Sequence, residues 1–130
     1  MVWVRGQEPL AVRRLTMFTF RVEDATGRPA TDLELYMGMP GHAVFVRRDR
    51  RVFAHVHPSG SAPMAAMEIG QRSLAGSGAP PAKPHVHDET GLPATVTVPY
   101  GFPEAGDYRL FVQIKRAGRV ETGAFDAHVD

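Results

Sequence analysis

Hydrophobic and polar residues alternate over short runs along this chain, which is the pattern of β-strands. In residues 15–22 the alternation places Phe18, Phe20 and Val22 on one face. Prolines and glycines occur throughout and leave no window with helical periodicity. The predicted strands are 15–22, 33–37, 42–47, 52–57, 94–98, 108–116 and 119–129. The sequence therefore predicts an all-β fold, an antiparallel immunoglobulin-like β-sandwich of about seven strands.

The chain has 130 residues, enough for one domain with its own core. We expect residues 1–14 to be an N-terminal extension and residues 15–130 to form the sandwich. Residues 59–92 are rich in Gly, Ala, Pro and Ser, and predict a long mobile loop. Tyr108 follows Gly106-Asp107 at the start of a late strand, as in the tyrosine corner of immunoglobulin-like folds.

Three histidines fall in two neighbouring predicted strands, 42–47 and 52–57. If these strands pair as a hairpin about Asp49-Arg50, His42 faces His57 directly. His55 lies on the same face, because side chains alternate along a strand. His42, His55 and His57 then form one patch, which is the minimum set of ligands for a metal site. The sequence therefore predicts a three-histidine metal site on this hairpin.

The site depends on the register of the hairpin. A turn one residue longer places His42 on the opposite face from His57, so the prediction requires an even loop. The predicted histidine face also carries Val44, Val46 and Phe53, which are typical of a core. We therefore expect the histidines at one end of the sandwich, where the strands leave the apolar interior.

Four methionines flank the hairpin in sequence: Met37, Met39, Met64 and Met67. Thioethers are soft ligands that suit Cu(I), and imidazole binds copper in either oxidation state. Mixed His and Met surroundings without thiolate therefore point to copper, with zinc as the alternative. Methionines also fill gaps in protein cores, so a purely structural role stays open.

A second histidine pair, His85 and His87, lies in the predicted loop. These residues are either solvated or fold over the site and complete it together with His55 and His57. His128 is expected to be a polar residue on an edge strand. Hydrogen-bonded histidines in a structural hairpin remain the alternative to any metal site.

Composition narrows the function. The formal net charge is +1, which gives no strong field for nucleic acid or acidic partners. The absence of cysteine excludes disulfides, thiolate zinc sites and blue-copper centres. No apolar run resembles a signal peptide or spans a membrane. We expect either a cytosolic protein or a soluble domain of a longer exported or membrane-anchored chain.

Two parts of the sequence resemble a little-characterised bacterial domain. They are Tyr36–Val44 with Phe53–Pro58, which form a G-H…H-x-H-P pattern, and Pro99–Pro103 with Gly106–Gln113. The bacterial domain that they resemble is an exported C-terminal β-sandwich module of membrane or secreted proteins associated with heavy metals. The resemblance covers residues 15–130 and implies a periplasmic or extracytoplasmic location. The His and Met usage is also similar to that of periplasmic copper-binding, cupredoxin-like sandwich domains.

Three functions follow as hypotheses. The first is a metal-binding module, with copper as the favoured ion, that binds, delivers or senses the ion beside a membrane protein or the membrane-embedded part of its own chain. The second is a metal-free interaction or spacer domain. The third is an enzyme, which we do not expect because nucleophile-elbow, phosphate-loop and zinc-protease motifs are absent. A metal-dependent activity is the one enzymatic alternative that remains.

Overall fold

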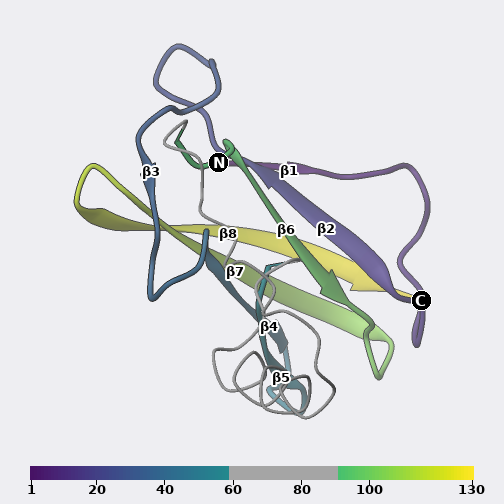
Figure 1. The fold of residues 1–130 in the computed structure, drawn as a ribbon. Coiled ribbons are helices and arrows are strands. Elements are labelled where there is room, and N and C mark those ends of the chain that lie inside the picture. The colour runs from purple at the N-terminus through teal and green to yellow at the C-terminus, as the bar shows by residue number, and fades with distance from the viewer. Residues whose placement is uncertain (59–90) are drawn as a thin grey trace, which may run out of the picture. The chain divides into compact units, whose positions relative to one another are not determined.

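The computed structural model describes residues 1–58 and 91–130, which form eight strands in two sheets (Figure 1). All the paired strands are antiparallel, so the prediction of an all-β antiparallel sandwich is confirmed. Within the described residues, no helix is long and apolar enough to span a membrane. The strands are β1 (Val2–Val4), β2 (Thr16–Arg21), β3 (Leu33–Glu34), β4 (His42–Arg47), β5 (Phe53–Val56), β6 (Thr95–Tyr100), β7 (Gly106–Arg116) and β8 (Arg119–Val129).

The smaller sheet has the order β1-β2-β6. Its first strand lies within residues 1–14, which the sequence analysis placed outside the sandwich, and it pairs with β2. The cause is the ring of Trp3, which packs with its centroid 5.8 Å from that of Phe18 and 6.2 Å from that of Phe20. Leu10 is also buried. The N-terminal segment therefore covers part of the core and accounts for the strand beyond the expected seven.

The larger sheet is built around β7. β8 pairs with β7 along its whole length through the turn Ala117-Gly118, as predicted. β4 and β3 both pair with β7 as well, so they follow one another along its opposite edge, and β5 pairs with the free side of β4. The predicted strand 33–37 is only two residues long, because the chain leaves the sheet after Glu34.

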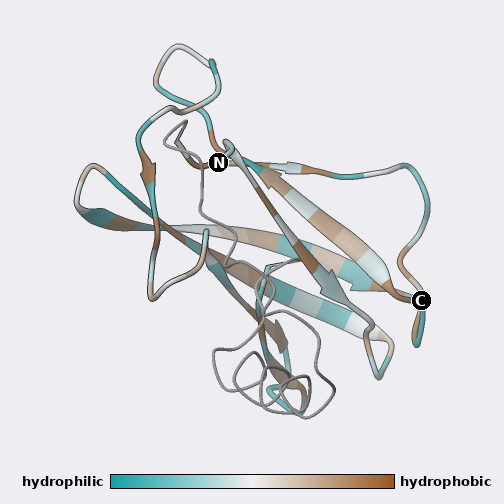
Figure 2. Cartoon of the chain, in the orientation of Figure 1, coloured by the Kyte–Doolittle hydropathy of each residue, from teal (hydrophilic) through white to brown (hydrophobic). Residues whose placement is uncertain are grey.

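The core lies between the two sheets and is largely aromatic. The rings of Phe18 and Phe45 meet edge to face at 5.1 Å, and Phe20 contacts Phe125 at the same distance. Phe18, Phe20 and Phe45 are at most 1% exposed. Replacing one such ring with alanine typically costs about 3–5 kcal/mol. These contacts fix which face of each sheet points inward, and Figure 2 shows hydrophobic and hydrophilic residues along β2 and β7.

Tyr108 makes the contact that the tyrosine-corner prediction requires. Its side chain is fully buried, and its hydroxyl donates a hydrogen bond of 2.8 Å to the carbonyl oxygen of Glu104, four residues upstream. Burial raises the pKa of the Tyr108 hydroxyl, which keeps it protonated and able to donate. The immunoglobulin-like topology itself stays a prediction.

The face of the histidine hairpin that points into the core is the opposite of the one expected. Ala43 and Phe45 point into the core, whereas Val44 and Val46 are only half-buried and Phe53 is 69% exposed. The prediction that Val44, Val46 and Phe53 share the core face is therefore wrong. Apolar residues occupy both faces of β4, so alternation alone could not choose between them. Packing chooses, because Phe45 contacts Phe18, Tyr100 and Phe102.

Candidate metal centre

The register of the β4–β5 hairpin is the one that the metal hypothesis requires. Val44 pairs with His55 and Ala43 pairs with Val56, so the next pair in register is His42 with His57. The loop spans residues 48–51. The Arg50 amide bonds to the Arg47 carbonyl at 2.7 Å, and Arg50 takes a positive φ of 65°. An even loop of four residues keeps all three histidines on one face.

The three imidazoles meet on the outer face of the five-stranded sheet. Their ring centroids are separated by 5.4 Å for His42 and His55, 5.3 Å for His42 and His57, and 4.8 Å for His55 and His57. Each ring offers one nitrogen, and the three nitrogens lie within 4.8 Å of one another. This histidine triad could hold a metal ion, and it contains no carboxylate.

His42 is the buried member of the triad, with 4% of its surface exposed. Its Nε2 lies 3.0 Å from the backbone carbonyl oxygen of Tyr36. A carbonyl can only accept, so Nε2 carries the proton and donates it. The lone pair of the neutral ring is then on Nδ1, which faces the Nε2 of His55 at 3.2 Å. Metal-bound histidines usually donate their second N–H in this way, so His42 is oriented as a ligand.

The carbonyl of Tyr36 reaches His42 because the chain loops out of the sheet between β3 and β4. Glu34 pairs with Lys115 and His42 pairs with Gln113, so eight steps along this segment match only two steps along β7. The extra residues form a tight turn with reciprocal backbone bonds between Tyr36 and Met39 of 2.8 and 3.1 Å. Positive φ values at Met37 (52°) and Gly38 (80°) make it a type I′ turn.

Gly41 sets the distance between β4 and β7 immediately before His42. A Cβ atom at this position would lie 2.7 Å from the backbone oxygen of Gln113. Only glycine allows the chain to approach β7 this closely as it returns from the turn to the sheet. The glycine of the G-H…H-x-H-P pattern thus helps to place the His42 ring.

The surroundings of His57 favour its neutral form. Burial lowers the pKa of His57, and the nearby imidazoles of His55 and His42 lower it further by charge repulsion. Metals bind the neutral ring and compete with protons for it. A lowered pKa therefore leaves His57 available as a ligand to a more acidic pH than usual.

The methionines and the other histidines are only partly placed. Met37 is 74% exposed at the tip of the Tyr36–Met39 turn, and Met39 is half-buried at its end. The turn is therefore linked to His42 through Tyr36, although neither thioether is shown beside the triad. Met64, Met67, His85 and His87 lie outside the described residues, as does most of the predicted mobile loop. Their roles stay predictions.

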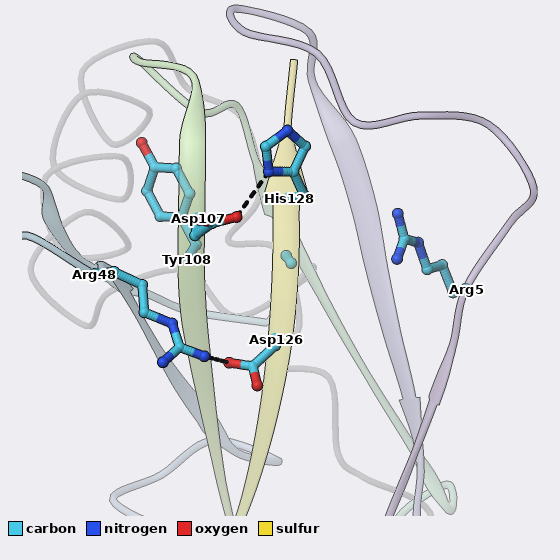
Figure 3. A pocket seen from close by; sticks show the side chains of 7 residues that line it. Arg5, Arg48, Asp107, Tyr108, Asp126 and His128 are labelled. Atoms are coloured by element: carbon cyan, nitrogen blue, oxygen red, sulfur yellow. Dashed lines mark hydrogen bonds and ion pairs between the residues drawn. The ribbon is translucent and has the colours of Figure 1, made fainter.

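His128 lies away from the triad, on the outer face of β8. Its Nδ1 bonds to Oδ1 of Asp107 at 2.7 Å, beside the ion pair of 2.8 Å between Arg48 and Asp126. Figure 3 shows both pairs at a hollow that Arg5 also lines. Each acid faces a base here, so His128 is held in an ion pair rather than grouped with other imidazoles. The expectation of a polar residue on an edge strand holds for His128.

Sequence reasoning missed two features of the site. One is the Tyr36 carbonyl, since a backbone contact leaves no signature in residue type. The other is a hollow beside His42 that is formed with Gln113 and Thr122. The pairing of β4 with β7 and of β7 with β8 brings these three residues to one row across the sheet. Predicting the hollow would have required the order of the strands in the sheet as well as their positions in the sequence.

The comparisons with known proteins bear on the family alone. No curated protein and no solved structure matches the chain. One family model, described as a domain of unknown function (DUF8832), matches residues 2–130 and thus includes the N-terminal strand β1. The chain therefore belongs to the DUF8832 family, whose function is unknown.

Proposed function

We propose that this domain binds one copper ion through His42, His55 and His57. The observation that carries the proposal is the geometry of His42, with Nε2 bonded to the Tyr36 carbonyl and Nδ1 placed 3.2 Å from the Nε2 of His55. Two ligands of a tetrahedral ion with metal–nitrogen bonds of 2.0–2.1 Å stand about 3.3 Å apart. An ion can therefore enter between these two nitrogens with little movement of the rings.

The donor set favours copper over other ions. Three imidazoles without a carboxylate are poor ligands for Mg²⁺ and Ca²⁺, which prefer oxygen. Among divalent ions Cu²⁺ binds nitrogen ligands most tightly, with Zn²⁺ below it. Met37 and Met39 belong to the turn that is bonded to His42, and their thioethers suit Cu(I). Zinc is the second choice.

The biological role we propose is to bind, deliver or sense copper on the extracytoplasmic side of a membrane. The support is the lack of cysteine, which suits an oxidising compartment, and the resemblance to exported modules of metal-associated proteins. The partner we propose is a membrane protein or the membrane-embedded part of the same chain. We propose no role in binding nucleic acid.

Calorimetric titration of untagged, metal-free protein tests the proposal. The titrants are Cu(II), Cu(I) under reductant, and Zn(II). We expect one tight copper site, weakened at least 100-fold in His55→Ala and in His57→Ala, because each variant removes one of three ligands. His128→Ala is the matched control, since it removes an exposed histidine outside the triad. Equal copper affinity in all three variants would reject the triad as the site.

The methionines have a test of their own. Met37→Leu and Met39→Leu remove a thioether and keep the size of the side chain. A thioether ligand predicts weaker Cu(I) binding and unchanged Cu(II) binding. Unchanged affinity for both ions in both variants excludes these two methionines from the site.

A metal-free interaction or spacer domain is the second candidate function. One observation favours it: His42 and His55 hydrogen-bond to each other, so the buried ring is satisfied without an ion. Phe53 also exposes 69% of its surface on the same face. In this case none of the three ions binds with saturation, and loss of His42 affects stability alone.

A further inference from the structure

A hollow of about 260 Å³ lies beside His42 on the outer face of the five-stranded sheet. Two cross-strand rows form it. In the first row His42 pairs with Gln113, which pairs with Thr122. In the second row Val44 pairs with Phe111. The residues that line the hollow are His42, Val44, Phe111, Gln113 and Thr122.

We propose that this hollow binds a small neutral nitrogen donor of the imidazole type, which takes the fourth position on the metal ion held by the histidine triad. The inference rests on the proposed metal-binding function and names a ligand for the same site. Three protein ligands leave one position of a four-coordinate ion open. No fourth His, Cys, Asp or Glu of the described residues joins the triad to fill that position.

The position of Val44 connects the hollow to the ion. Val44 lies directly opposite His55 on β5 and two residues after His42 on β4, so it adjoins both residues whose nitrogens face each other. It also forms part of the wall of the hollow. A guest lying over Val44 therefore has its donor atom next to the ion, and the rest of the molecule lies over β7.

The walls of the hollow select the chemistry of the guest. Val44 and Phe111 are apolar, and the ring of Phe111 offers a flat partner for an aromatic ring. The polar side chains are Gln113 and Thr122, which are neutral and lie 3.4 Å apart, Nε2 to Oγ1. The oxygen of either group can accept the distal N–H of an imidazole. Among the described residues, no charged side chain lines the hollow to neutralise an anion.

The size of the hollow also fits a ring better than water. A water molecule takes about 30 Å³ of liquid volume, so the hollow is far larger than one solvent ligand needs. It lies on the outer face of the sheet, and we propose that a free small molecule or a histidine side chain from another protein enters it. Both sources present the same imidazole chemistry, and the experiment separates them.

The experiment uses the chain of 130 residues carrying His85→Ala and His87→Ala, so that neither of these histidines competes for the open position. The protein is loaded with one equivalent of Cu(II), and imidazole is titrated in while calorimetry and electron paramagnetic resonance are recorded. We expect one imidazole per copper, with altered nitrogen hyperfine coupling and with copper retained. Blocked Gly-His-Gly peptide forms a second arm, and azide forms a third.

Two variants test the hollow itself. Thr122→Phe fills it from an exposed position and should weaken imidazole binding at least tenfold, while the copper affinity and the spectrum before imidazole stay unchanged. Gln113→Leu removes one hydrogen-bonding partner and should weaken imidazole binding several-fold. Thr95→Phe places the same bulk at an exposed position on β6, in the other sheet, and should change nothing.

The outcomes separate the inference from the proposed function. Imidazole binding that Thr122→Phe weakens supports the inference, and binding of the peptide as well identifies a protein as a competent source. Imidazole binding that is unaffected by Thr122→Phe, removal of the copper by imidazole, or stronger binding of azide than of imidazole overturns the inference and leaves the copper site intact. Failure to bind copper at all overturns both.

Discussion

The protein places histidines in two opposite environments on the same sheet. In the histidine triad, with His42 on β4, His55 on β5 and His57 just after it, burial and the neighbouring imidazoles of His55 and His42 lower the pKa of His57. His128 on β8 bonds to Asp107 and lies near Asp130, so its pKa is raised. The same residue type is thus kept neutral at one site and favoured as a cation at the other. Neutral rings bind metals, whereas a charged ring forms an ion pair.

The largest predicted effect concerns Gly41. The backbone at Gly41 lies close to β7 just before His42, and the pair of His128 with Asp107 depends on no such close approach. Gly41→Ala places a Cβ atom 2.7 Å from the Gln113 oxygen. We expect a loss of about 1–3 kcal/mol in the free energy of unfolding, the usual cost of overpacking, together with weaker copper binding. Denaturant titration with and without copper measures both.

Gly6→Ala is the matched control, because nothing lies within 4 Å of a Cβ atom at that position. It should leave both the stability and the copper affinity near those of the parent protein. Equal stability of the two alanine variants would show that the approach of Gly41 to β7 does not position His42.

A smaller effect is expected at Met37, whose backbone is strained in the turn that is bonded to His42. Met37 takes a φ of 52°, which costs a residue with a side chain about 1–2 kcal/mol and glycine little. Met37→Gly should therefore raise the free energy of unfolding by about 1 kcal/mol. Met17→Gly, within β2, should lower it by a similar amount because glycine weakens strands. If both variants lose stability, the strain at Met37 is absent.

The smallest effect is a contrast in pH dependence, measured on metal-free protein in chelator. His128 gains a proton more readily when folded, so its contribution to stability is present below its unfolded pKa and lost as pH rises through the folded pKa. His57 binds its proton less readily when folded, so stability falls as pH drops below the unfolded pKa, near 6.5.

Thermal unfolding of His128→Gln and His57→Gln between pH 5 and pH 8.5 measures the two slopes. Relative to the parent protein, His128→Gln should lose the most stability at the acidic end of this range. The stability of His57→Gln relative to the parent protein should be greatest at that same acidic end. Parallel pH profiles of stability for the two variants would contradict the opposite pKa shifts of His57 and His128.

The grouping of His42, His55 and His57 could be predicted from the sequence because it depends on two local properties. One is the alternation of side chains along β4 and β5, and the other is the even length of the loop at residues 48–51. Phe18 and Phe20 were likewise assigned to the core by alternation alone. In each case neighbours in sequence carried enough information.

The parts that could not be predicted depend on contacts between distant segments. Apolar residues on both faces of β4 left the inner face undecided until Phe45 met Phe18. The predicted strand 33–37 was too long because β-propensity does not reveal that the chain leaves the sheet at Leu35. Trp3 looked like part of an extension because its partners come later in the chain.

The locality of the triad has a thermodynamic consequence. All three proposed ligands lie between His42 and His57, on one hairpin, so they stay near one another even when the chain is unfolded. Unfolded chains then retain some affinity for the ion, and binding to the unfolded state subtracts from the stabilisation that binding to the folded state provides. The melting temperature should therefore rise less on loading than the dissociation constant of the folded protein implies.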